Sequence, residues 1–304
     1  MKNPIPYLIL LMAILSACNH ASKQPASEPA APPKNHLPGY PNGSDVVQAY
    51  TQYLRSLDTL TLSNSQAALK EFDLRFTTQS PEVCDTGFML FLDFQRTLNT
   101  QDSNIAKFVS HADMEHLFMI QNHERTANAQ EQAAGQKLAA NNFIITVEEG
   151  GYGPFIVPAW QPMADHFFHY VSKPMKEVLV RENMEQKKPF MGDDGVLVNP
   201  SELVHRTIGW ERFLAGYPHH IYDSIARSNY NEMVHIMVEF ATEMPLNDST
   251  NTPTIAPFYD TVFHLIHDGF PGSHTDAVIN PWWQALLAKD TVTMRKIRDS
   301  LPSH

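Results

Sequence analysis

Several features that define common enzyme classes are absent from this chain of 304 residues. It has only two cysteines, Cys18 and Cys84, and therefore no Cys-x-x-Cys pair of the kind used by redox dithiols and thiolate zinc sites. No Gly-x-Ser-x-Gly or His-Glu-x-x-His sequence occurs. The chain therefore lacks the motifs that usually indicate catalysis by serine, by cysteine or by a common metalloprotease. We expect no cofactor, and binding rather than catalysis.

Positive charge is also scarce. The chain has 22 lysines and arginines against 33 aspartates and glutamates, and they are scattered singly or in short pairs. Phosphate backbones are bound by basic stripes, so a nucleic-acid partner is excluded.

No hydrophobic run is long enough to span a bilayer. The run from Tyr7 to Leu15 has the length of a signal-peptide core, and Lys2 supplies the positive charge that precedes such cores. It is followed by Leu15-Ser16-Ala17-Cys18, which resembles the lipobox of bacterial lipoproteins. The resemblance implies cleavage after residue 17 and attachment of acyl chains such as palmitate to Cys18. Residues 1–17 are therefore predicted to be a signal peptide, and the membrane to be a partner through the lipid anchor.

Residues 18–43 are rich in proline, alanine and serine and have no hydrophobic period, which predicts a disordered tether. No acidic residue directly follows Cys18, although acidic residues there direct some lipoproteins to the outer face. We therefore expect an outer-membrane lipoprotein that faces the periplasm.

Beyond Ser44 the spacing of apolar residues predicts one mainly α-helical domain over 44–304, with a possible sub-boundary near 141–160. Helices are expected over 44–57, 65–76, from Pro81, over 104–120 and 123–140, and from about Pro162. Cys84 lies at helical spacing among apolar residues, which predicts a buried, unreactive thiol. Residues 143–148 break the helical period and predict one short strand or extended connector that ends in a glycine turn.

A particularly well-marked helix is expected over 199–216. Asn199 can cap its first turn, Pro200 fits the first position, and Glu202 is placed to reach back to the cap. Gly216 is the expected stop.

Two segments 53 residues apart share a local pattern: Gly216-Tyr217-Pro218 and Gly269-Phe270-Pro271, each followed by an aspartate and a β-branched residue at the same offsets. Glycine ends a helix, proline blocks its continuation, and a new helix starts a few residues later. The stretch Trp210–Pro218 resembles the tetratricopeptide-like units of outer-membrane lipoproteins, which implies protein or peptide binding. The fold is then a helical bundle or an irregular α-solenoid of helix hairpins.

The 15 histidines offer two sets of candidate metal ligands. Ligands three or four residues apart share a helix face. This spacing selects Asp260, His264 and His267, together with His166 and His169. An alternative interpretation is that these residues lie on the polar, solvent-facing sides of amphipathic helices. The corresponding alternative function is a zinc-dependent hydrolase.

A candidate ligand-binding loop lies next to the predicted strand. Glu148 and Glu149 offer acceptors, Tyr152 and Trp160 offer aromatic surface, and the intervening glycines permit unusual backbone angles. The same residues also fit a plain strand-to-helix turn.

Our main hypothesis is a membrane-anchored lipoprotein with a helical domain that binds a ligand or an envelope protein or peptide.

Replacing the proposed acyl acceptor tests the anchor. Cys18→Ser should abolish lipidation and leave an uncleaved precursor, because the thiol receives the lipid before cleavage. Intact-protein mass spectrometry and membrane fractionation would measure both effects. Normal processing of the variant would contradict the lipobox assignment.

Overall fold

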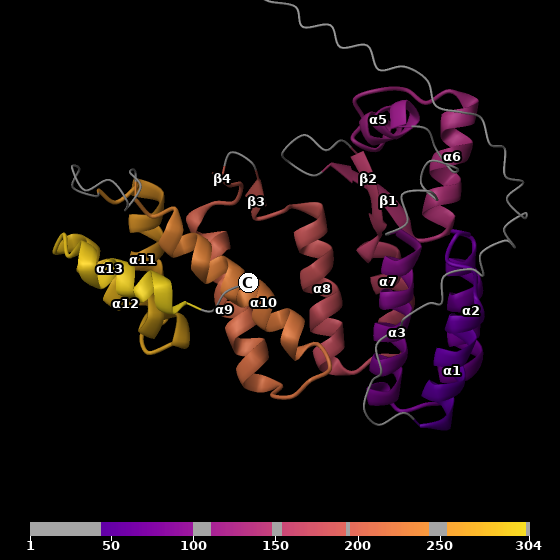
Figure 1. Cartoon of the computed structure of the whole chain (residues 1–304), viewed down its shortest axis with the longest axis horizontal. Coiled ribbons are helices and arrows are strands. Elements are labelled where there is room, and N and C mark those ends of the chain that lie inside the picture. Colours follow the sequence, from indigo (N-terminus) through magenta and orange to yellow (C-terminus); the bar gives the residue numbers. More distant parts are fainter. Residues whose placement is uncertain (1–43, 100–110, 148–153, 193–194, 243–253, 302–304) are drawn as a thin grey trace, which may run out of the picture. The chain divides into compact units, whose positions relative to one another are not determined.

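The computed structural model describes residues 44–99, 111–147, 154–192, 195–242 and 254–301. Within them it contains twelve helices and two small antiparallel hairpins, which confirms the predicted mainly α-helical class (Figure 1). The helices are α1 (Asp45–Ser56), α2 (Asn64–Phe76), α3 (Pro81–Asn99), α5 (His111–Gln121), α6 (Ala129–Ala140), α7 (Trp160–Phe167), α8 (Lys173–Lys187), α9 (Pro200–Gly216), α10 (Asp223–Glu239), α11 (Pro257–Gly269), α12 (His274–Leu287) and α13 (Thr291–Ser300). The strands are β1 (Phe143–Val147), β2 (Pro154–Pro158), β3 (Met191–Gly192) and β4 (Gly195–Val196). None of these helices is long and apolar enough to cross a membrane.

The first three helices pack through aromatic side chains. Tyr50 of α1 lies edge-on to Phe72 and Phe76 of α2, and the two phenylalanine rings are stacked 4.6 Å apart. The apolar spacing that predicts a helix over 44–57 is confirmed as a buried stripe on α1, formed by Val47, Tyr50 and Leu54. Cys84 of α3 is 1% exposed, and burial raises its pKa to about 11, so it is a buried thiol as predicted.

Helix α6 begins later than expected. Residues 122–128 form a turn, and the helix starts behind Asn128, whose side chain accepts hydrogen bonds from the backbone N–H groups of Gln130 and Glu131. Glu131 in turn accepts from the Asn128 N–H, which completes a capping box. The capping box therefore sets the start of the helix.

The extended segment is a hairpin rather than a single strand. β1 pairs with β2 in antiparallel register, with Ile145 opposite Ile156. The sequence did not predict β2, because prolines at both of its ends are typical of loops. They are tolerated here since the terminal positions of a short strand need not donate to the ladder. On the outer edge of β1, the Gln121 side chain both donates to the Ile145 carbonyl (2.9 Å) and accepts from its N–H (3.2 Å).

One cluster of buried apolar side chains extends from α1 to α13. Segment 141–160, where a sub-boundary was possible, contributes Phe143, Ile145 and Ile156 to this cluster.

The two glycine-aromatic-proline turns have the same backbone geometry. α9 ends at Gly216 and α11 ends at Gly269, and the aromatic residue after each has similar angles (φ −133°, ψ 60° and φ −136°, ψ 48°). Two residues later, His219 and Gly272 both have positive φ, 68° and 76°. α9 packs against both α10 and α11, and α11 packs against α12. The repeated sequence pattern is therefore a repeated helix-ending turn.

The start of α9 differs in one respect from the prediction. Asn199 does cap the helix, accepting a hydrogen bond from the Glu202 N–H at 2.9 Å. The Glu202 side chain, however, forms ion pairs with Lys188 and Arg206. The expected return bond to the cap is replaced because a buried arginine is a stronger partner for a carboxylate than a backbone N–H.

A glycine substitution in α3, with a control in α6, tests the packing of α3 against the phenylalanines of α2. In α3, a Cβ on Gly87 would lie 2.7 Å from Phe76 and 2.8 Å from Phe72, whereas a Cβ on Gly135 in α6 would lie 3.8 Å from Leu117. Gly87→Ala should lower the free energy of unfolding by about 1–3 kcal/mol through overpacking. Gly135→Ala should raise it by up to about 1 kcal/mol, because alanine is the better helix former. Urea unfolding of both variants would check this, and equal effects would contradict it.

Candidate functional site

Helix α8 carries the clearest candidate site. Ser172 caps it, accepting a hydrogen bond from the Met175 N–H, and Pro174 occupies the first turn. The face that begins with buried Val178 and Leu179 continues, at helical spacing, with Glu182 and Glu185. The fold thus turns two carboxylates toward the side of the helix that packs against protein.

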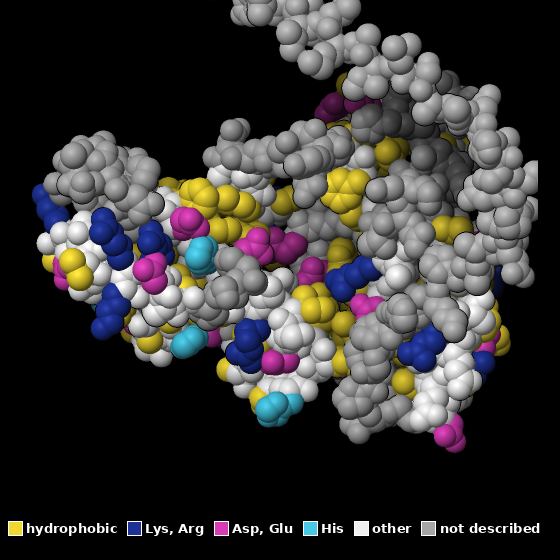
Figure 2. Space-filling model, in the orientation of Figure 1, with side chains coloured by type: hydrophobic (Ala, Val, Ile, Leu, Met, Phe, Trp, Pro, Cys, Tyr) yellow, Lys and Arg dark blue, Asp and Glu magenta, His cyan; other side chains and the backbone are white. Residues whose placement is uncertain are grey.

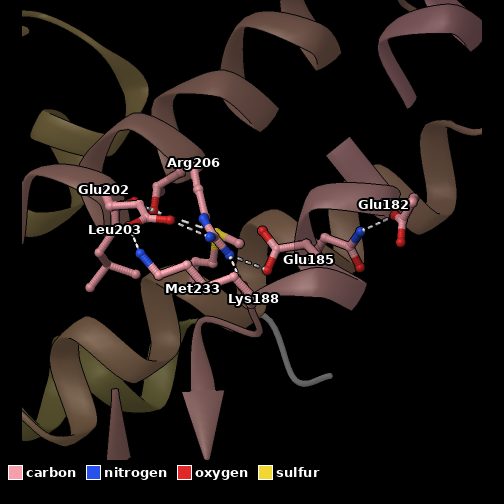
Figure 3. Close-up of polar contacts among 9 residues, drawn as sticks. Glu182, Glu185, Lys188, Glu202, Leu203, Arg206 and Met233 are labelled. Carbon is pink, nitrogen blue, oxygen red and sulfur yellow. Dashed lines mark hydrogen bonds and ion pairs between the residues drawn. The ribbon is translucent and has the colours of Figure 1, made fainter. Parts of the chain in front are cut away.

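Arg206 of α9 holds one of these carboxylates. Its side chain is only 2% exposed, and Nη1 donates to Glu185 Oε2 at 2.6 Å and to the Lys188 carbonyl at 2.8 Å. On its other side the guanidinium donates to Glu202, which also pairs with Lys188 (Figure 3). A buried guanidinium needs such partners, because an unpaired buried charge is very costly.

Glu182 is held by neutral groups from α10 and the turn before it. Its Oε1 accepts hydrogen bonds from the Tyr222 hydroxyl and from Asn229 Nδ2, both at 2.9 Å. Burial raises the pKa of Glu182 despite these bonds and the nearby positive charge of Arg96. Burial, with the Glu182 charge, also raises the pKa of Tyr222 well above its usual value. The tyrosine therefore acts as a hydrogen-bond donor to the carboxylate.

The pKa of Glu185 is raised as well. Burial raises its pKa to about 7, and the attraction of Arg206 opposes this rise without cancelling it. Its second oxygen, Oε1, is buried and has no hydrogen-bond partner in the described part of the chain. A carboxyl with an unpaired buried oxygen loses less when it is protonated, so the geometry and the raised pKa agree.

Two cavities meet at these carboxylates. The first, of about 510 Å³, lies between α8 and the β1–β2 hairpin, and we call it the hairpin cavity. The second, of about 280 Å³, lies between α8, α9 and α10, and we call it the α10 cavity. Glu182, Glu185 and Pro189 line both. Figure 2 shows acidic side chains gathered beside the upper half of α8, between hydrophobic surfaces. We define the α8 site as Glu182 and Glu185 with the two cavities that they line.

A further cavity, of about 720 Å³, lies at the opposite end of α8. Its buried carboxylate, Asp85, accepts hydrogen bonds from the Ser172 N–H (2.8 Å) and hydroxyl (2.5 Å) and contacts His220 Nε2 at 3.3 Å. Because the His220 Nδ1 accepts from the Tyr222 N–H, Nε2 is the atom that donates to Asp85. Protein groups therefore occupy this carboxylate, which ties α3 to the start of α8 and to the α9–α10 turn.

One of the predicted ligand-binding residues reaches the α8 site. Trp160 begins α7, is 9% exposed and lines the hairpin cavity. Its backbone N–H donates to Gln186 Oε1 of α8 at 2.7 Å. The other three predicted residues, Glu148, Glu149 and Tyr152, lie outside the described residues.

The five predicted metal ligands have separate surroundings. His166 pairs with Asp73 of α2 at 2.8 Å, and His169 is exposed beyond the end of α7. On α11, His264 pairs with Asp268 and His267 with Asp276, while Asp260 is partly buried. No group of three or more His, Cys, Asp or Glu side chains is placed to hold a metal ion within the segments that the structure describes.

Glu182, Glu185 and Arg206 were not predicted as site residues from the sequence. A signal was present, because both glutamates continue the apolar face of α8 and Arg206 lies on the apolar face of α9 between Leu203 and Trp210. Charged residues at buried positions of an amphipathic helix are rarely tolerated without partners. Such positions are recognisable once the buried face is known.

The raised pKa of Glu185 predicts a distinct pH dependence of stability. The unfolded chain releases this proton near 4.5 and the folded chain holds it up to about 7. Its contribution is therefore fully present below pH 4.5 and is lost as pH rises through 7, by up to about 3 kcal/mol. Urea unfolding between about pH 5 and 8 should show this loss in the wild type and not in Glu185→Gln.

Glu202→Gln is the matched control. Hydrogen bonds from Lys188 and Arg206 lower the pKa of Glu202, so its contribution is lost only as pH falls below the ordinary carboxyl range. That variant should keep the loss of stability due to Glu185, shifted to lower pH because the Glu202 charge is one of the causes that raise the pKa of Glu185. An identical slope in the wild type and Glu185→Gln would show that Glu185 does not titrate in this range.

Comparisons with models of known protein families, with curated proteins and with solved structures found no significant match to this chain. A helical architecture does not by itself specify a function, since one fold supports many activities. The chemistry of the α8 site is therefore the guide to function.

Proposed function

We propose that this chain is a lipid-anchored envelope protein that binds a ligand at the α8 site. The observation that carries the proposal is the pair of partly buried carboxylates, Glu182 and Glu185, that line two adjoining cavities. Cavities with mostly apolar walls and a few perturbed ionisable groups are the usual form of ligand sites. The ligand is a small molecule or a side chain of an envelope protein or peptide.

The walls of the cavities favour binding over covalent catalysis. Among the described residues that line them there is no serine, cysteine or histidine to serve as a nucleophile or its base. Glu185 is held by Arg206 and Glu182 by Tyr222 and Asn229, so both carboxylates have fixed orientations. Fixed polar groups in an apolar cavity select and orient a ligand.

The membrane attachment in this proposal comes from the lipobox-like sequence at Cys18. A lipidated N-terminus followed by a proline-rich tether leaves the helical domain free to meet ligands in the periplasm, with the outer membrane as the anchoring surface. Binding and anchoring are separate parts of the proposal, and each has its own test.

Blocking the hairpin cavity tests the binding function. Thr146 of β1 lines this cavity, whereas Thr86 of α3 lines the cavity beside Asp85. Thr146→Trp should fill the first, and Thr86→Trp, the matched control, should fill the second. The lipidated protein, purified from membranes of the cells that express it, would be compared by native mass spectrometry.

The wild type and Thr86→Trp should carry a bound mass that Thr146→Trp lacks. Thermal unfolding of the three proteins would confirm that each is folded. An equal bound mass in Thr146→Trp, or none in the wild type and the control, would overturn the proposed function.

A further inference from the structure

Two opposite charges face the hairpin cavity without pairing with each other. Arg96 of α3 and Glu182 of α8 both line this cavity. Burial raises the pKa of Glu182 and the positive charge of Arg96 opposes that rise, so each group lies in the electrostatic field of the other. The ion pairs within the described residues nevertheless include none between them. The ion pair that Arg96 forms is with Asp93, one turn back along α3, at 3.5 Å.

Both groups have hydrogen-bonding capacity left for a ligand. The Arg96 side chain is 46% exposed, and exposed ion pairs such as its contact with Asp93 contribute little. Glu182 uses one oxygen, Oε1, for its hydrogen bonds with Tyr222 and Asn229. Its other oxygen, Oε2, takes no part in these bonds. Unlike Glu185 Oε1, it is not one of the enclosed atoms that lack a partner, so it is accessible.

The third charge on the wall of the hairpin cavity is already matched. Glu185 lines this cavity as well, but its Oε2 accepts a hydrogen bond from Arg206 at 2.6 Å and its Oε1 is enclosed. A ligand in the cavity therefore meets one available positive group and one available negative group. A molecule with a single charge would be attracted by one of them and repelled by the other.

Much of the remaining wall is apolar or aromatic. Phe118, Ile144, Val157 and Trp160 lie on it, and the volume of about 510 Å³ is within the range of small-molecule sites, roughly 300–1,000 Å³. An apolar group placed against these side chains gains from the removal of both surfaces from water. The cavity thus fits an apolar body attached to a head that carries both charges.

We infer that the ligand of the α8 site is a zwitterion of the α-amino-acid type. Its carboxylate binds Arg96, its ammonium group binds Glu182 Oε2, and its apolar side chain lies in the hairpin cavity. The inference rests on the proposed function and names its ligand class. Arginine suits the carboxylate because a planar guanidinium can donate two parallel hydrogen bonds to it. The ammonium group donates to the one oxygen of Glu182 that Tyr222 and Asn229 leave open.

Three probes with the same phenyl body separate the contributions of the two charges. Phenylalanine carries both at neutral pH, phenethylamine carries only the ammonium group, and hydrocinnamate carries only the carboxylate. Isothermal titration of the full mature protein should show saturable binding of phenylalanine and at least about tenfold weaker binding of each of the other two. Each singly charged probe loses one charged hydrogen bond and keeps a repulsion.

Two conservative variants assign the charges. Arg96→Gln should weaken binding of phenylalanine at least about tenfold without weakening that of phenethylamine. Glu182→Gln should do the same without weakening that of hydrocinnamate, and its amide oxygen can still accept from Tyr222 and Asn229. The matched control, Arg227→Gln, removes another exposed arginine that pairs with an aspartate of its own helix and lines neither cavity. It should bind phenylalanine like the wild type.

Thermal unfolding of the three variants would show that each is folded. No saturable binding of phenylalanine, equal binding of phenylalanine and either singly charged probe, or an affinity for phenylalanine that either Arg96→Gln or Glu182→Gln leaves unchanged would overturn the inference. The test of the proposed function is independent, because it detects whatever ligand the protein carries. A bound mass that Thr146→Trp lacks, together with no binding of phenylalanine, would refute the amino-acid ligand and leave the proposed function intact.

Discussion

The arrangement around α8 depends on one constraint, the burial of the Arg206 guanidinium. A charge that is removed from water has to be matched by opposite charge and hydrogen bonds at close range. Glu185, Glu202 and the Lys188 carbonyl supply them, from the end of α8 and the start of α9. The contacts of Arg206 therefore fix how these two helices approach each other, and they hold Glu185 between two cavities.

The same constraint explains why the two carboxylates of α8 differ. Glu182 has two neutral donors, Tyr222 and Asn229, on one oxygen. Glu185 has a cationic donor on one oxygen and nothing among the described residues on the other. The burial of Arg206 thus accounts for the contact made by one carboxylate oxygen of Glu185, Oε2.

Much of the fold could be predicted from local sequence patterns. The cap at Asn199, the stop at Gly216 and the buried stripe of α1 depend on neighbours within a few residues, and each is observed. β2 could not be predicted in the same way, because Pro154 and Pro158 are compatible with a strand only when β1 is there to pair with.

The candidate site was harder to predict than the fold. Glu202 stands at a position that is typical of a capping box. Its observed partners are instead Arg206, one turn further along α9, and Lys188, at the end of α8. Glu182 and Glu185 resemble ordinary surface residues of a charged helix until the partners of α8 are known. Trp160 was selected from the sequence for its place near a glycine turn, and it lines the hairpin cavity.

The Gln121 side chain has a consequence for the kind of partner that this protein accepts. By donating to and accepting from Ile145, it occupies the backbone groups that an incoming strand would use at the outer edge of β1. An extended peptide can add to the hairpin at that edge only by displacing the glutamine. At this point along β1, therefore, the Gln121 side chain blocks recognition of a partner through main-chain pairing. A partner that binds here has to be recognised through its side chains or functional groups.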